Sequence, residues 1–251
     1  MKRFVWFILP MIVVFALWEI VSRSDFVNPS LFPPPSKVAV ALWGMLATGT
    51  LFSDVRDSLW RLVAGLFIGS AVGVILGLLT GQIKSFATAL TPIIQIVRPL
   101  PPVAIIPLVI VWFGIDNGAK IFSIAFAVFF PVWINTHIGA MQIPRAFLWG
   151  AKLLTKSSVK IFREIVFPAT LPFTIAGIRT GIAVGFIMVF VSELAGASSG
   201  LGYRISVTHL AYRIDEMMAA LAVLGALGAI ADQLFVVGTR KLFPWTILSS
   251  S

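Results

Sequence analysis

The chain has 251 residues, of which 59% are hydrophobic and only 12% are charged, and its formal net charge is +9. Soluble globular domains carry about a quarter charged residues, so this composition excludes an ordinary soluble protein and predicts an integral membrane protein. The apolar runs show no strand alternation and must satisfy their own backbone hydrogen bonds in lipid, which predicts an all-α membrane fold.

Six apolar segments have about the 20 residues that a helix needs to cross the hydrocarbon core. In chain order they cover residues 4–21, 60–81, 87–113, 120–137, 171–195 and 217–238. A proline-rich stretch, 28–37, and a short interfacial helix, 38–47, are expected after the first of them, and a turn followed by a short helix within 196–216.

The second segment carries a glycine at every fourth position. These glycines are Gly65, Gly69, Gly73, Gly77 and Gly81. Small residues at this spacing share one helix face and let another helix approach closely. We expect packing within the subunit rather than a direct role in transport.

The third segment is interrupted by prolines at Pro99, Pro101 and Pro102, directly after Arg98. Proline removes a helix donor and forces a break. A break at membrane depth is tolerated where it is buried in protein or lines a cavity. These four residues are therefore candidates for a translocation pathway, with Arg98 either contacting an anionic substrate or bracing the break.

Lysine and arginine retained on the cytoplasmic side set the orientation of a membrane protein. With the N-terminus inside, the cytoplasmic segments hold ten bases and one acid, and the outer segments hold seven bases and six acids. This asymmetry predicts that both termini are cytoplasmic. It also accounts for the positive charge without a nucleic-acid partner.

Charges inside apolar segments are costly and point to function or to pairing. Glu19 is expected to reach the headgroups at the outer end of the first segment, and Glu193 to contribute to an outer gate or a dimer contact. Asp232 is expected to pair with Arg240 or Lys241, and Arg179 to anchor the inner side or to pair with Asp232.

The chain has no cysteine and two histidines that are distant in sequence, His137 and His209. Disulfides, thiolate metal sites and a cysteine nucleophile are therefore excluded. We expect no metal site, and we place His137 at the end of a span and His209 on the surface.

The longest polar stretch between apolar runs covers residues 139–178 and carries five bases against one acid, Glu164. Its sequence predicts a helix over Arg145–Leu154 and a second short helix that Ser157 or Ser158 caps and that ends before Pro168. Such short amphipathic helices suit either protein docking or contact with anionic lipid. The helical spacing of Val159, Phe162 and Val166 would place these three apolar residues on one face of the second helix.

This stretch resembles the cytoplasmic loop of bacterial ATP-binding-cassette (ABC) importer permeases. The family pattern is Glu-Ala-Ala, three residues, Gly, nine residues, Ile, one residue, Leu-Pro. Anchored on Pro168, it places Trp149, Gly150 and Ala151 at Glu-Ala-Ala, Thr155 at Gly, and Ile165 and Phe167 at Ile and Leu. The frame fits, while the family glutamate and glycine are replaced.

Other stretches are similar to the nitrate/sulfonate/taurine permease subfamily. They are RPLPPVAIIPLVIVWFGI, FPPPSKV, LPFTIAGIRTGIAVG, SELAGASSGLGY and the closing FPW. The resemblance covers nearly the whole chain. It implies a type I ABC importer permease fold in the bacterial cytoplasmic membrane.

The resemblance also implies the partners. They are two cytoplasmic ABC ATPase subunits, a second permease subunit in a homodimer or heterodimer, a periplasmic or lipoprotein substrate-binding protein, and membrane lipid. ATP and Mg²⁺ would be bound by the ATPases, and no cofactor is expected in this chain, which has no phosphate-binding Gly-rich loop and no expected enzymatic activity. Trp149, Gly150, Ala151, Thr155, Ile165, Phe167 and Pro168 would couple ATPase closure to the spans.

We divide the single permease domain, 1–251, into a first helix with a proline-rich segment (1–56), a core (57–238) that contains the coupling loop (139–170), and a tail (239–251). The expected cargo is a small anion such as nitrate, a sulfonate such as taurine, or bicarbonate. A vitamin or pyrimidine precursor is the alternative. An ion-coupled transporter is disfavoured because only one broken segment occurs, and a membrane enzyme because the charges are scattered over different segments.

Overall fold

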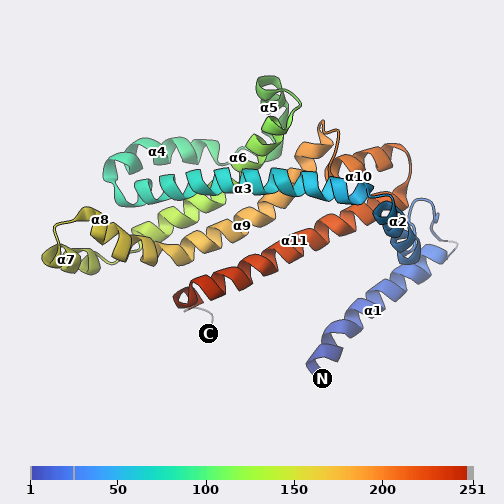
Figure 1. The fold of residues 1–251 in the computed structure, drawn as a ribbon, viewed down its shortest axis with the longest axis horizontal. Helices are drawn as coiled ribbons and strands as arrows, with labels where there is room; N and C mark the ends of the chain where they lie inside the picture. The colour runs from blue at the N-terminus through green and yellow to red at the C-terminus, as the bar shows by residue number, and fades with distance from the viewer. Residues whose placement is uncertain (1, 25, 248–251) are drawn as a thin grey trace.

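The computed structural model describes residues 2–24 and 26–247, with side chains for 9–24 and 26–245. In this part of the chain every regular element is a helix, as the all-α prediction requires (Figure 1). The long helices are α1 (Lys2–Arg23), α3 (Thr50–Gln82), α6 (Asn117–Met141), α9 (Phe167–Leu194) and α11 (Ile214–Leu242). The shorter ones are α2 (Pro35–Ala47), α4 (Lys84–Val97), η1 (Pro102–Ile105), α5 (Ile106–Phe113), α7 (Arg145–Leu154), α8 (Ser158–Ile161), η2 (Phe162–Val166), α10 (Leu201–Leu210) and η3 (Pro244–Ile247).

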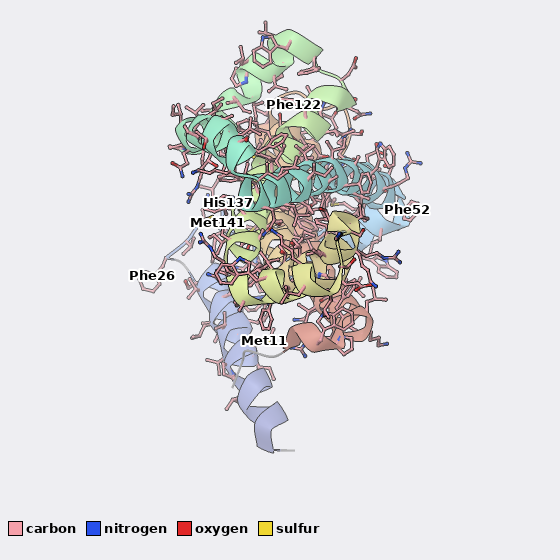
Figure 2. All side chains as sticks on the ribbon, turned by 90° about the vertical axis from the view of Figure 1, so that its left-hand side faces the viewer. Met11, Phe26, Phe52, Phe122, His137 and Met141 are labelled. Atoms are coloured by element: carbon pink, nitrogen blue, oxygen red, sulfur yellow. The ribbon has the colours of Figure 1, made fainter. Side chains whose placement is uncertain are left out.

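Four helical segments among the described residues are long and apolar enough to cross a membrane, or five if the bent pair α4 and α5 counts as one span. They coincide with five of the six predicted spans. The remaining prediction, 4–21, falls on α1, which extends away from the other long helices in both views, with Met11 on the projecting part (Figures 1 and 2). Its crossing of the membrane stays a prediction, and the tail residues 248–251 lie outside the described part.

Helix α6 is the centre of the bundle, because half of its apolar window is buried, whereas only 6% of the corresponding window of α11 is. Ile124, Val128 and Val132 of α6 are completely buried and pack with Leu62 of α3 and Ile182 of α9. The three helices run side by side along the molecule (Figure 1). They hold α7 and α8 at one end and α10 at the other.

We call the end that carries α7 and α8 the inner end, following the charge distribution, and the end that carries α10 the outer end. Figure 2 looks at the molecule from the inner end, with α7 and α8 in front of the bundle. Helix α3 enters at the outer end and α4 begins beside its inner end (Figure 1). The predicted coupling loop therefore lies at the inner end of the core formed by α3, α6 and α9, and Glu193, at the end of α9, lies at the outer end.

The glycines of α3 form the contact with α6. A Cβ atom at Gly69 would lie 2.5 Å from the carbonyl oxygen of Ala125, and one at Gly73 would lie 2.9 Å from the Cβ of Val132. The other three glycines meet Ile124, Thr136 and Ala140 in the same way. The prediction of tight packing within the subunit is confirmed, since each glycine removes the one atom that would hold the two backbones apart.

We expect Gly69→Ala to lower the free energy of unfolding by about 1–3 kcal/mol, because the new methyl group meets a backbone carbonyl that cannot move aside. The matched control is Gly225→Ala in α11, where a Cβ has open space within 4 Å. That change should be neutral or stabilising by up to about 1 kcal/mol, the helix propensity difference. Denaturant unfolding of the purified chain in detergent measures both, and equal stability of the two variants would contradict the assignment.

Candidate functional site

The inner loop begins with α7, whose bounds agree with the predicted helix over Arg145–Leu154. Ala151 of this helix is buried, whereas Trp149 is 63% exposed and Gly150 has open space around it. Helix α7 thus turns only part of its apolar surface toward the rest of the chain. The exposed large apolar side chains of α7 and α8, which we call the inner apolar surface, are Phe147, Trp149, Leu153, Leu154 and Val159.

The turn between α7 and α8 needs no glycine. Thr155, at the position of the family glycine, has φ −152° and ψ 143°, which is extended backbone that a β-branched residue adopts readily. Its hydroxyl accepts a hydrogen bond from the backbone N–H of Ser157 at 3.2 Å. Ser157 in turn accepts one from the N–H of Lys160 at 3.3 Å, so Ser157 is the cap of α8.

The prediction that the second helix ends before Pro168 is wrong. The chain is helical from Ser158 to Leu194 and passes Pro168 by way of the π-helical turn η2. In this turn the N–H of Phe167 bonds to the carbonyl of Phe162, five residues back. The wider turn accommodates a proline that has no N–H to donate and whose ring would clash in a regular α-helix.

The apolar face predicted for this second helix is only partly packed. Val166 is buried, but Val159 is exposed. Phe162 lines a cavity of about 630 Å³ with Leu148 of α7 and Leu78 of α3. Within the predicted coupling set, Ile165 and Pro168 are half-buried and Phe167 is exposed. Ile165 lies in η2, and Phe167 and Pro168 are the first two residues of α9.

The predicted break in the third apolar segment is confirmed. Helix α4 ends at Val97 and the axis bends by 86° before Phe113. The backbone N–H of Arg98 bonds to the carbonyl of Ile94 at 2.8 Å and closes α4. The side chains of Arg98, Pro99 and Pro101 are exposed and that of Pro102 is half-buried, and α5 projects from the bundle (Figure 1).

Glu193 lies in a buried polar cluster at the outer end. Its carboxylate accepts from the Nη1 of Arg61 at 2.6 Å, from the hydroxyl of Ser58 at 2.9 Å and from the N–H of Gly202 at 2.8 Å. The Glu193 side chain has no exposed surface and that of Arg61 is 5% exposed. Buried ion pairs persist when their remaining hydrogen-bonding capacity is satisfied, and that is the case here.

The loop before α10 is held by the same cluster. Arg61 also donates to the amide oxygen of Asn117 at 2.7 Å and to the carbonyl of Ser199 at 2.7 Å. Asp54 accepts from the N–H of Gly200 at 3.0 Å and from Arg204 at 2.7 Å. The cluster therefore ties α3, α6, α9 and α10 together at one end of the bundle.

Gly200 has φ 115°, a conformation that L side chains rarely adopt, and a Cβ there would meet the Glu193 carboxylate. Its conformation therefore requires glycine. The short helix predicted in this region is α10, and His209 is exposed on it as expected. His137, at the inner part of α6, bonds through Nδ1 to the hydroxyl of Thr80 at 2.9 Å.

The structure also gives the partners of Asp232 and Glu19. Asp232 does not pair with Arg240 or Lys241; it forms a two-point ion pair with Arg179, at 2.7 and 2.8 Å. Glu19 accepts hydrogen bonds from the N–H and hydroxyl of Ser36 and from Arg23, and its position at the headgroups stays a prediction. Arg61 and Asp54 are among the bases and acids counted in the outer segments, but their partners lie more than 100 residues away and the sequence does not indicate them.

Comparison with protein families adds a finding over most of the chain. A family model described as binding-protein-dependent transport system inner membrane component matches residues 69–241. The match includes α7, α8 and the long helix that follows them. Outside it lie α1, α2 and the outer part of α3.

Two relatives are similar over nearly their whole length. A putative aliphatic sulfonates transport permease protein of Bacillus subtilis is 30% identical over 97% of this chain and 89% of its own. A nitrate import permease protein of Synechocystis sp. is 28% identical over 88% of this chain and 82% of its own. The predicted likeness to nitrate and sulfonate permeases is confirmed.

The fold also has a counterpart of known structure. An amino acid ABC transporter solved with histidines contains a chain that superposes with a TM-score of 0.62, at 16% identity, over 81% of this chain and 97% of that one. At this identity the likeness concerns the fold. It confirms the predicted ABC importer permease architecture.

Proposed function

Because this chain belongs to the family of binding-protein-dependent transport system inner membrane components, we propose that it forms the translocation pathway for a small oxyanion such as a sulfonate or nitrate. The sulfonate and nitrate permeases among its relatives support the class of cargo. The several apolar helices fit a multi-pass inner membrane protein. We further propose that this membrane is the bacterial cytoplasmic membrane and that both termini of the chain are cytoplasmic.

The observation that carries the coupling part of this proposal is the inner apolar surface. Leu153 and Leu154 are 88% and 89% exposed, beside Lys152 and Lys156, in a loop that the charge distribution predicts to be cytoplasmic. Exposed apolar side chains gathered in one place mark a protein interaction site. We assign this surface to a cytoplasmic ABC ATPase, which binds ATP and Mg²⁺ while this chain binds neither.

Trp149, Gly150, Ala151 and Thr155 lie on α7 or directly after it, and Ile165, Phe167 and Pro168 lie where the loop enters α9. The second half of the loop is thus part of the same continuous helical segment as α9, Ser158–Leu194. Movement of a docked ATPase would reach the core of the bundle through this continuous helix.

We place the pathway beside the broken segment, where Arg98, Pro99, Pro101 and Pro102 line the bend between α4 and α5. The exposed Arg98 side chain makes no ion pair within the described part of the chain, which leaves its charge available to an anion. A second permease subunit would complete the wall, and a substrate-binding protein would deliver the cargo at the outer end. Glu193, which is buried in the polar cluster, would act as a gate only if that cluster opens.

The test is uptake into proteoliposomes that hold this chain with the ATPase and binding protein encoded beside it. We expect uptake of a labelled sulfonate or nitrate to require internal ATP and the external binding protein. Uptake that proceeds on an ion gradient without ATP would contradict the proposal. Uptake restricted to a vitamin or pyrimidine precursor would retain the ABC mechanism and reject the oxyanion.

A further inference from the structure

A small polar cavity opens beside the buried cluster at the outer end. Its volume is about 180 Å³, below the roughly 300–1,000 Å³ of most ligand pockets, so it fits a molecule of a few heavy atoms. Residues of α3, of the start of α6 and of the loop before α10 surround it. They are Asp57, Trp60, Arg61, Ile115, Asp116, Asn117, Lys120, Ser198 and Ser199.

The buried part of the lining carries two cations, Arg61, which is paired with Glu193, and Lys120. Arg61 and Lys120 are 4% and 5% exposed. The Nζ of Lys120 donates to the carbonyl oxygens of Ile115 at 2.5 Å and Asp116 at 3.4 Å, and no carboxylate of a described residue lies within 4.0 Å of it. An ammonium group has three donors and is costly to bury without an anion, so Lys120 retains capacity for an anionic group.

The exposed part of the lining carries the opposite charge. Asp116 is exposed, and Asp57 is 26% exposed and paired with the exposed Arg56 at 3.1 Å. Trp60, on the same helix as Asp57, is also exposed. A carboxylate beside an aromatic face attracts ammonium groups, whereas a bare anion entering here is repelled by the carboxylate of Asp116, since that of Asp57 is paired with Arg56.

We propose that this cavity is a binding site for a small zwitterion, with its oxyanionic group toward Lys120 and its amine toward Asp116 and Trp60. The inference rests on the proposed import function and adds to it a selectivity step within the permease chain. A sulfonate or carboxylate that carries a primary amine satisfies both ends of the cavity. The same acid without the amine satisfies only one.

The test is isothermal titration calorimetry on the purified full-length chain in detergent, with taurine, ethanesulfonate and ethylamine as probes. Taurine and ethanesulfonate differ only by the amine. We expect taurine to bind about tenfold more tightly than ethanesulfonate, because only taurine carries an amine that can donate a hydrogen bond to the Asp116 carboxylate. Ethylamine should give no measurable binding.

Two variants assign the ends of the ligand. Lys120→Met should abolish taurine binding, and Lys120→Arg should retain it. Asp116→Asn, which keeps a residue suited to the start of α6, should make taurine and ethanesulfonate bind equally. Lys37→Met, an exposed lysine elsewhere at the outer end, is the control and should bind taurine like the unmodified chain.

Equal affinity of the unmodified chain for taurine and ethanesulfonate, or the absence of taurine binding, overturns the inference. If Lys120→Met fails to fold, as judged by its circular dichroism, Asp116→Asn decides alone. ATP-driven uptake of plain oxyanions without taurine binding in this titration rejects the cavity site and leaves the proposed function intact. Taurine binding without any ATP-driven uptake supports the cavity site and rejects the proposed function.

Discussion

Alanine in place of Glu193 is expected to lower the free energy of unfolding of the purified chain by about 3–5 kcal/mol, because it leaves a buried charge without its partner. The side chains of Glu193 and Arg61 are 0% and 5% exposed, and the pair is 2.6 Å apart. The substitution also removes the acceptor for the N–H of Gly202. The contact between α9 and α10 should then loosen, while Asp54 of α3 still accepts from the N–H of Gly200.

Denaturant unfolding in detergent measures this loss. The control is Arg56→Ala, whose ion pair with Asp57 has a 70% exposed arginine and should contribute about 1 kcal/mol or less. The double variant Arg61→Met with Glu193→Met should recover part of the stability, since neither charge is then buried alone. Unchanged stability of Glu193→Ala combined with lost uptake would refute the structural role and favour a gate.

The helices of the core were predictable because their signals are local. Long apolar runs mark the spans, and the glycine spacing of α3 marks its contact face. The sequence did not indicate which helix meets that face. The structure supplies α6, whose Ile124, Val128, Val132, Thr136 and Ala140 share the same four-residue spacing.

The outer cluster was not predictable because its partners are distant in the chain. Arg61 and Glu193 are separated by 132 residues, and Asp54 and Arg204 by 150. A charge near the end of a span looks the same in sequence whether it faces water or a buried partner. Only the arrangement of α3, α9 and α10 decides between the two.

The inner loop shows how a local rule can fail. A proline normally ends a helix at the preceding residue, which is why the second helix was expected to stop before Pro168. The π-turn from Phe162 to Val166 shifts the hydrogen-bond register by one residue, so the helix continues. The signal for such a turn is weak, because it depends on packing around the proline as well as on the proline itself.

Replacing Trp149 with alanine or aspartate should weaken ATPase association about tenfold or more while the spans stay folded. Large aromatic side chains dominate protein interfaces, and removing one typically costs 2 kcal/mol or more. Trp149 is 63% exposed on α7, so within this chain it loses little packing. Ala151 is a poor probe by comparison, because it is buried and an added side chain would displace α7 itself.

Co-purification of the ATPase and ATP-driven uptake are the two measurements, and Trp43→Ala is the matched control. Trp43 is 73% exposed but lies on α2, away from the inner loop. We expect Trp43→Ala to retain both activities, and Trp149→Asp to lose both with an unchanged unfolding midpoint. ATPase association that survives Trp149→Asp would contradict the assigned surface.

A companion variant, Thr155→Gly, separates docking from the shape of the loop. The extended backbone of Thr155 requires no glycine, so restoring the family residue should not improve coupling. It should slightly lower the stability of the turn between α7 and α8, because the hydroxyl that accepts from the N–H of Ser157 is lost and glycine loses more conformational entropy on folding. Improved ATP-driven uptake in Thr155→Gly would show instead that the threonine restrains the turn, and coupling would then depend on loop flexibility rather than on the tryptophan alone.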